Sequence, residues 1–123
     1  MTLSPDNARI HMRTRMLYGD EIAMGPGKAT LLESIAEKGS ISAAAKQMNM
    51  SYRRAWLLVD TMNRCFASPL VISAAGGKQG GGAHLSSLGI EVLQDFRAME
   101  AEIMIVSAAH LIKLKKHLVT VAE

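Results

Sequence analysis

Residues 39–56 of this chain read GSISAAAKQMNMSYRRAW, and they are the most informative part of the sequence about the fold. Residues 40–42 start a short helix of small side chains, which ends at residue 47 or 48 and allows a neighbouring helix to approach closely. A tight turn at residues 49–50 leads to Ser51, whose hydroxyl group is a good N-cap for the next helix. The stretch therefore predicts two helices joined by a short turn.

The residues on either side extend this pattern to three helices. A helix is expected at about 28–37, and Gly39 suits the position just beyond its C-terminus. The helix that follows Ser51 runs to about residue 66, and its apolar residues recur at the spacing of one buried helical face. These residues are Ala55, Leu58, Val59 and Met62.

Two further regions are expected to be extended. In residues 9–17 the side chains alternate between basic and largely apolar, which predicts a half-buried strand with a basic outer side. After Pro69, residues 70–72 are expected to form a strand and residues 83–85 to return beside it. Residues 76–82 between them contain five glycines, without the lysine and serine or threonine of a Walker motif, so a hairpin tip is favoured over a nucleotide-phosphate loop.

The last third of the chain is expected to be one long helix with Ser86 as its N-cap. Apolar residues recur about every 3.5 positions from Ile90 to Leu118, and residues 86–118 would span roughly 50 Å as a helix. A domain of this size cannot cover such a helix, so pairing with a second copy is favoured over packing back onto the same chain. The residues expected at the dimer contact are Leu93, Phe96, Ile103 and Val106.

The order of a strand, three helices, a hairpin and a long helix is that of a winged helix-turn-helix with a dimerisation helix. The predicted fold class is mainly α with a small β-hairpin (α+β). Residues 1–85 are expected to form the DNA-binding domain, with the helix-turn-helix at about 28–66 and the wing at about 70–85. Residues 86–123 are expected to form the long dimerisation helix.

This arrangement predicts double-stranded DNA as the partner, because the third helix enters the major groove and the wing reaches flanking backbone or the minor groove. Arginine can bond guanine through two N–H groups, tyrosine can bond a phosphate, and tryptophan can contact a thymine methyl group. For Trp56 the alternative is burial against the wing. The residues expected to contact DNA are Ser42, Ser51, Tyr52, Arg53, Arg54, Trp56, Lys78 and Gln79.

Composition limits the other classes of function. The chain has 123 residues, of which 49% are hydrophobic and 20% charged, so one globular domain is expected. The net charge is +3, and residues 27–66 contain six lysines and arginines against three acidic residues, which fits nucleic acid but also an ordinary solvated surface. Without a long apolar stretch or a recognisable signal peptide, the expected location is the cytoplasm, with no membrane partner.

No pattern for catalysis stands out. Cys65 is the single cysteine, so it cannot form a disulfide within the chain, and no base is placed beside it. His110 and His117 lie seven residues apart in the expected long helix, where surface histidines are favoured over a metal site shared across a dimer. We therefore expect no enzymatic activity, no metal and no cofactor.

Two motifs occur in this chain in a defined order. The first combines GSISAAA at 39–45 with MSYRRAW at 50–56, and the second is GGKQGGGAHLS at 76–86 followed by Gly89. Together they resemble the N-terminal DNA-binding domain of molybdate-responsive ModE-type regulators, and the helix-turn-helix is more distantly similar to that of LysR-type regulators. The resemblance covers roughly 26–102 and implies a dimer that binds DNA.

Members of that family continue after the long helix into oxyanion-binding subdomains, whereas this sequence stops at Glu123. The expectation is therefore a homodimeric, sequence-specific transcriptional regulator without its own molybdate site. Its operator, its effector or partner regulator, and the sign of regulation stay open. The alternatives are a non-specific architectural DNA-binding protein and a protein-interaction module built on the winged scaffold.

Overall fold

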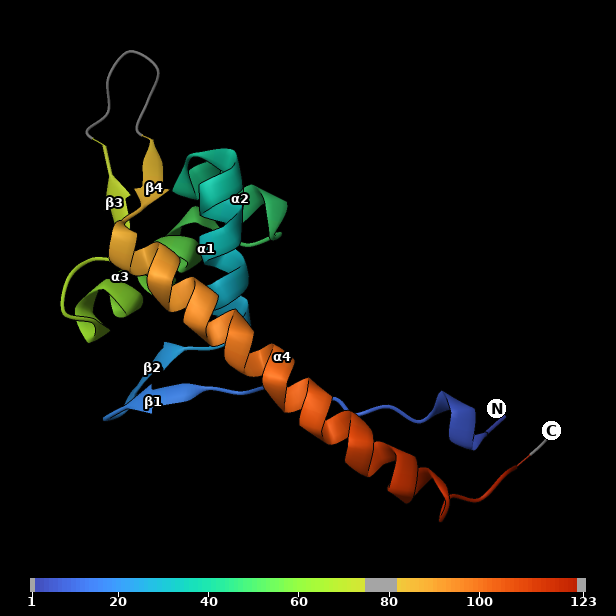
Figure 1. The fold of residues 1–123 in the computed structure, drawn as a ribbon. Coiled ribbons are helices and arrows are strands. Elements are labelled where there is room, and N and C mark those ends of the chain that lie inside the picture. Colours follow the sequence, from blue (N-terminus) through green and yellow to red (C-terminus); the bar gives the residue numbers. More distant parts are fainter. Residues whose placement is uncertain (1, 75–81, 122–123) are drawn as a thin grey trace. The chain divides into compact units, whose positions relative to one another are not determined.

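A computed structural model describes residues 2–74 and 82–121 (Figure 1). Within these residues the fold is α+β, as predicted, with four α-helices and two sheets of two antiparallel strands each. No helix in this part of the chain is long and apolar enough to cross a membrane. The elements in chain order are a 3-10 turn at Pro5–Asn7, β1 (Met16–Tyr18), β2 (Glu21–Met24), α1 (Pro26–Lys38), α2 (Ile41–Gln47), α3 (Tyr52–Cys65), β3 (Val71–Ser73), β4 (Ala83–Leu85) and α4 (Ser87–Lys115).

The chain divides into two compact units. Arg13–Arg97 form the first, which we call the helix–hairpin unit because it contains both sheets together with α1, α2 and α3. The described residues of Met1–Met12 and Ala98–Glu123 form the second, which we call the terminal unit. The residues of α4 belong to both units, so its two parts are described separately.

Local capping sets the boundaries of the first three helices. α1 ends at Gly39, whose φ of 75° lies in the left-handed region that favours glycine. The hydroxyl oxygen of Ser40 accepts a hydrogen bond of 3.0 Å from the N–H of Ala43 and starts α2. Ser51 does the same for α3 by accepting from the N–H of Arg54 at 3.1 Å. The caps predicted at Gly39 and Ser51 are confirmed.

The core of the helix–hairpin unit lies where α1, α2 and α3 pack against one another. The short side chains of α2 allow this close packing, and each fully buried leucine or isoleucine contributes about 1.5–3 kcal/mol. Leu58, expected in the buried stripe of α3, is only half-buried. The buried apolar residues of the three helices are Ala29, Leu31, Leu32, Ile35, Ile41, Ala44, Ala45, Ala55, Val59 and Met62.

The strand predicted at 9–17 is present only at its end. β1 begins at Met16 and pairs with β2 after a tight turn, in which Gly19 has a φ of 61°. Residues 8–15 have no regular structure. A strand needs a partner for its backbone N–H and C=O groups, and only the last residues of the predicted segment have one. The alternation of side chains therefore overestimated the strand and did not reveal β2.

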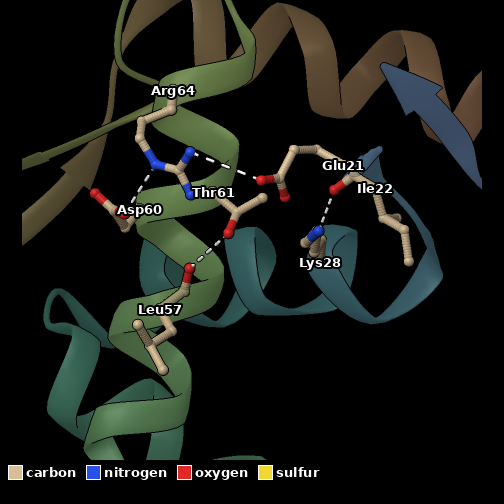
Figure 2. A network of polar contacts seen from close by, with 7 residues as sticks. All are labelled: Glu21, Ile22, Lys28, Leu57, Asp60, Thr61 and Arg64. Carbon is tan, nitrogen blue, oxygen red and sulfur yellow. Dashed lines mark hydrogen bonds and ion pairs between the residues drawn. The ribbon is translucent and has the colours of Figure 1, made fainter. Parts of the chain in front are cut away.

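Polar contacts attach β2 to α3 and α1 (Figure 2). Arg64 of α3 donates to Asp60, one turn earlier, at 3.0 Å, and its guanidinium group lies 3.8 Å from Glu21 of β2. The ammonium group of Lys28 on α1 donates to the carbonyl oxygen of Ile22. The β1–β2 hairpin is thus bonded through β2 to two of the three core helices.

Asn63 of α3 holds the start of β3. Its side-chain oxygen accepts from the N–H groups of Leu70 at 2.8 Å and Val71 at 3.1 Å, and its amide group donates to the Val71 carbonyl oxygen at 3.2 Å. β3 pairs in register with β4, with Val71 opposite Leu85. One asparagine therefore satisfies three backbone groups at the start of β3.

Gly89 allows the first turn of α4 to lie against the segment before β3. The Ser86 hydroxyl oxygen accepts from the Gly89 N–H at 3.0 Å and donates to the carbonyl oxygen of Pro69 at 2.7 Å. A Cβ atom at position 89 would lie 2.2 Å from the Leu70 carbonyl oxygen. The cap predicted at Ser86 is confirmed, and the close approach explains why residue 89 is glycine.

α4 ends at Lys115, although a helix was predicted over 86–123. A backbone turn follows the helix, and Val121 then pairs with Leu3 through two backbone hydrogen bonds of 2.9 Å. Val119, Thr120 and Val121 are all β-branched, and such residues favour extended backbone over helix. The shorter helix therefore has a local cause and a pairing partner within the terminal unit.

Candidate nucleic-acid interface

The first turns of α3 present the large residues that were predicted to contact DNA. Tyr52 is 55% exposed and Trp56 is 47% exposed, and the two arginines between them are exposed as well. Ala55, in the same turn, is fully buried. α3 therefore turns its small residues inward and its large aromatic and basic residues outward. The alternative expected for Trp56, burial against the hairpin, is wrong.

Arg53 and Arg54 keep their guanidinium groups unpaired within the described residues. In contrast, Arg64 and Arg97 of the same unit bond carboxylate groups at 3.0 Å and 2.7 Å. The hydroxyl oxygen of Ser51 is used for capping α3, so this residue first of all positions the turn. Two unpaired guanidinium groups, each with five N–H donors, are thus available to an external acceptor.

A cleft of about 220 Å³, which we call the hairpin cleft, lies on one flank of α3. Ser40, Ser42 and Tyr52 line it, together with residues of β3, β4 and the adjoining Ala74 and Gly82. The N–H of Ala83 donates to the Gly39 carbonyl oxygen at 2.8 Å and joins the hairpin to the start of α2. The predicted contact residues Lys78 and Gln79 lie outside the described residues.

A second cleft of about 220 Å³, which we call the arginine cleft, is lined by another set of residues. Arg54 of α3 borders it together with Arg13 and Arg15, which precede β1. Gly25, Pro26 and Gly27 at the start of α1 form another part of its wall. Tyr52 and Arg54, two residues apart on α3, therefore border different clefts.

Lys28 is a further cation in the wall of the arginine cleft. Its side chain is buried, and the pKa of its ammonium group is lowered from the usual value mainly by this burial. The charge of Arg15 acts in the same direction, whereas Cys65 and Glu21 oppose it. The hydrogen bond to the Ile22 carbonyl oxygen gives the buried ammonium group a partner. The cleft thus combines three exposed guanidinium groups with one buried cation.

Several known proteins are similar to this chain in sequence. No protein-family model matches the chain. Over 80 residues the chain is 44% identical to the molybdenum transport protein ModE of Azotobacter vinelandii, a match that covers 65% of this chain and 30% of that protein. Over 78 residues it is 45% identical to the molybdenum-pterin-binding protein MopB of Rhodobacter capsulatus, covering 63% and 29%. Over 69 residues it is 44% identical to the DNA-binding transcriptional dual regulator ModE of Escherichia coli (strain K12), covering 56% and 26%.

These matches support a relationship between this chain and the ModE family. The resemblance to ModE-type regulators depends on two motifs and covers roughly residues 26–102, and these matches extend over a comparable 56–65% of the chain. The matched region spans 30% or less of the length of these ModE and Mop proteins. The likeness to ModE therefore concerns one part of the relatives and not their whole length.

The four residues predicted at a dimer contact have different surroundings. Phe96 is only 6% exposed, so it is already covered by its own chain, and Leu93 is half-buried. Ile103 is half-buried, whereas Val106 is 61% exposed. The burial of Phe96 argues against its contact with a second copy and favours a role in the core.

The terminal unit has a largely apolar groove of about 340 Å³ along α4. Met12, Met99, Ile103 and Val106 supply most of its apolar lining. More apolar side chains of the same part of α4 are exposed, namely Met104, Ile105, Ile112 and Leu114. The helix thus has a much larger apolar surface than its own unit covers.

In residues 2–74 and 82–121, no three His, Cys, Asp or Glu side chains come together as a metal site requires. Cys65 is a half-buried free thiol. No buried side-chain nitrogen or oxygen atom in the same residues lacks a hydrogen-bond partner.

Sequence reasoning missed the arginine cleft and its buried lysine. The alternation at residues 9–17 predicts Arg13 and Arg15 on the outer side of a strand, and Lys28 stands out in the sequence only as part of a basic region. A signal was present, because these basic residues flank the Gly-Pro-Gly sequence at 25–27. The sequence could not show that Arg54 would meet them, since their proximity depends on how the β1–β2 hairpin packs against α3.

Proposed function

We propose that this chain is a sequence-specific, DNA-binding transcriptional regulator that acts as a homodimer. The observation that carries the proposal is the first part of α3, where Tyr52, Arg53 and Trp56 are exposed on a capped helix and the guanidinium group of Arg53 has no partner among the described residues. The printed name of the Escherichia coli relative, a DNA-binding transcriptional dual regulator, supports it further.

In this proposal the chain folds as a winged helix-turn-helix, with α2 and α3 as the two helices of the motif and β3 and β4 as the wing. α3 enters the major groove with its N-terminal residues toward the bases. Arg53 bonds the O6 and N7 atoms of a guanine, and Trp56 contacts a thymine methyl group. The hydroxyl groups of Ser42 and Tyr52 bond phosphate oxygens, and Lys78 and Gln79 act from the wing.

The dimer in this proposal is formed through the part of α4 in the terminal unit. Val106 and Ile103 line an apolar groove there, and more apolar side chains around it are exposed. A two-fold dimer would bind half-sites one helical turn apart, about 34 Å centre to centre. The regulator would then act by occupying a promoter. That the chain has no molybdate site of its own stays a prediction.

The test compares Arg53→Ala with Arg64→Ala, two arginines of the same helix. Arg53→Ala should weaken binding to a selected duplex by about 1–3 kcal/mol and relax the preference at one base position of each half-site. Arg64→Ala should leave both unchanged, because its guanidinium group is already paired with Asp60. Both are measured by titration of labelled selected and random duplexes at fixed salt.

Two results would contradict the proposal. If the unmodified protein binds neither duplex, a protein-interaction module is the better description. If it binds both duplexes equally and Arg53→Ala lowers the two affinities by the same factor, the protein is an architectural DNA-binding protein rather than a sequence reader.

A further inference from the structure

The arginine cleft has an excess of positive charge that nothing in its wall neutralises. Arg13, Arg15 and Arg54 come from two separate segments, and no aspartate or glutamate is among the residues that line the cleft. The three guanidinium groups have no hydrogen-bond or ion-pair partner within residues 2–74 and 82–121. Like charges gathered in this way repel one another, so the arrangement favours the binding of an anion.

The shape of the cleft suits a small anionic group. Its volume of about 220 Å³ is below the range of about 300–1,000 Å³ for sites that enclose drug-sized ligands. Part of the wall is the bare backbone around Gly25, where α1 begins without a side-chain cap. A Cβ atom at position 25 would lie 3.5 Å from the Arg15 Cγ atom, so the Arg15 side chain runs along this backbone. The cleft can therefore accept an oxygen-rich group that touches both backbone and arginine.

The position of the arginine cleft indicates which anion it binds. Arg54 directly follows Arg53, the residue assigned above to base contact, and borders the cleft from the first turn of α3. A duplex bound by α3 brings a phosphate every 3.4 Å or so along each strand. We infer that the arginine cleft binds a backbone phosphate of that duplex, with Arg13 and Arg15 as phosphate ligands. This inference rests on the proposed function.

Two further observations agree with a phosphate at this place. Arg15 and the buried Lys28 repel each other, and an anion between the cationic side chains would offset that repulsion. Four hydroxyl-bearing residues, Tyr52 among them, line the hairpin cleft, while Arg54 borders the arginine cleft. Phosphate contacts from both clefts would hold α3 in the groove by two strands of the duplex and fix its register.

The experiment uses the charge-removing variant Arg13→Gln/Arg15→Gln in the full chain. As the matched control, Arg9→Gln/Lys116→Gln removes the same charge from residues that neither line the cleft nor belong to α4. Binding to selected and random duplexes is measured over a salt series. If each subunit of a dimer loses one phosphate contact, the slope of log Kobs against log salt should fall by about 1.8, that is about 0.9 per phosphate. The loss should be equal on both duplexes, and the control should keep the slope.

Arg13→Lys/Arg15→Lys keeps the charge and should recover most of the slope, and circular dichroism of every variant verifies folding. A wild-type slope in Arg13→Gln/Arg15→Gln, with specific binding intact, overturns the cleft inference alone. If the unmodified protein shows no specific DNA binding, the proposed function is overturned. Titration with inorganic phosphate in the absence of DNA tests whether the ligand of the cleft is a free oxyanion instead of a DNA phosphate. Tight binding that needs Arg13 and Arg15, with the DNA slope unaffected, would make the cleft a site for a free oxyanion and refute the DNA contact.

Discussion

The helix–hairpin unit and the terminal unit treat their apolar residues in opposite ways. Every buried hydrophobic residue of the described chain lies between Ala23 and Phe96, within the helix–hairpin unit. In the terminal unit, Ile105 is 71% exposed and Val106 is 61% exposed. The first unit has a closed core of its own, and the second leaves much of its apolar surface uncovered.

The difference shows which apolar surfaces a single chain of this length can cover by itself. Three helices and two short hairpins supply enough surfaces to cover one another, and Asn63 and Ser86 satisfy the backbone at their junctions. Residues 98–115 form one helix, and a lone helix cannot bury its apolar residues on all sides. We therefore expect the helix–hairpin unit to be stable by itself and the terminal unit to depend on a second copy.

The largest effect is expected from Ile103→Lys/Val106→Lys. Dimerisation would bury four added ammonium groups without partners, and desolvation costs several kcal/mol for each such ion. The dimer should weaken by at least about 4 kcal/mol, roughly a thousandfold in Kd. Sedimentation equilibrium should find the unmodified protein near twice 13.3 kDa and the variant near 13.3 kDa. Gln94→Lys, on the same helix, is the control and should stay dimeric. If the unmodified protein is a monomer at micromolar concentration, the expectation that the terminal unit depends on a second copy is wrong.

An intermediate effect is expected from Gly89→Ala, which tests how tightly the helix–hairpin unit is closed. The added methyl group would meet the Leu70 carbonyl oxygen, a backbone atom that cannot move aside without disturbing β3. The free energy of unfolding should fall by about 3 kcal/mol, at the upper end for overpacking. Gly27→Ala is the control, because a Cβ atom there meets nothing within 4 Å. Urea unfolding measures both, and equal stability of the two variants would show that the junction is loose.

The smallest effect is expected from the buried cation in that unit. Burial lowers the pKa of Lys28 in the folded protein, so the unfolded chain binds more protons at pH values approaching 10.5. The stability of the unmodified protein should therefore gain from rising pH in that range, compared with Lys28→Met. Lys46→Met, at an exposed lysine, is the control and should keep the gain. Urea unfolding at pH 8 and pH 10 provides the comparison, and parallel changes in all three proteins would contradict the role of burial.

Much of the helix–hairpin unit could be predicted because its signals are local. Gly39, Ser51 and Ser86 act on residues within one turn of themselves, so their capping roles could be read from the sequence. The exposed side of α3 followed from the spacing of its small and apolar residues. The length of β1 could not be predicted, because a strand ends where its hydrogen-bonding partner ends and that partner lies in another segment.

Local sequence predicts where the helices begin and end around residues 39–56 and which side of α3 is buried, since both depend on neighbours within a few positions. Tertiary packing brings Arg54, Arg13 and Arg15 to one cleft while Tyr52 borders another. It also decided that Phe96 belongs to the core while Val106 stays exposed, although both lie on the same apolar series. The reason is physical: periodicity predicts which residues share a face, but the other elements of the fold decide how much of that face is covered.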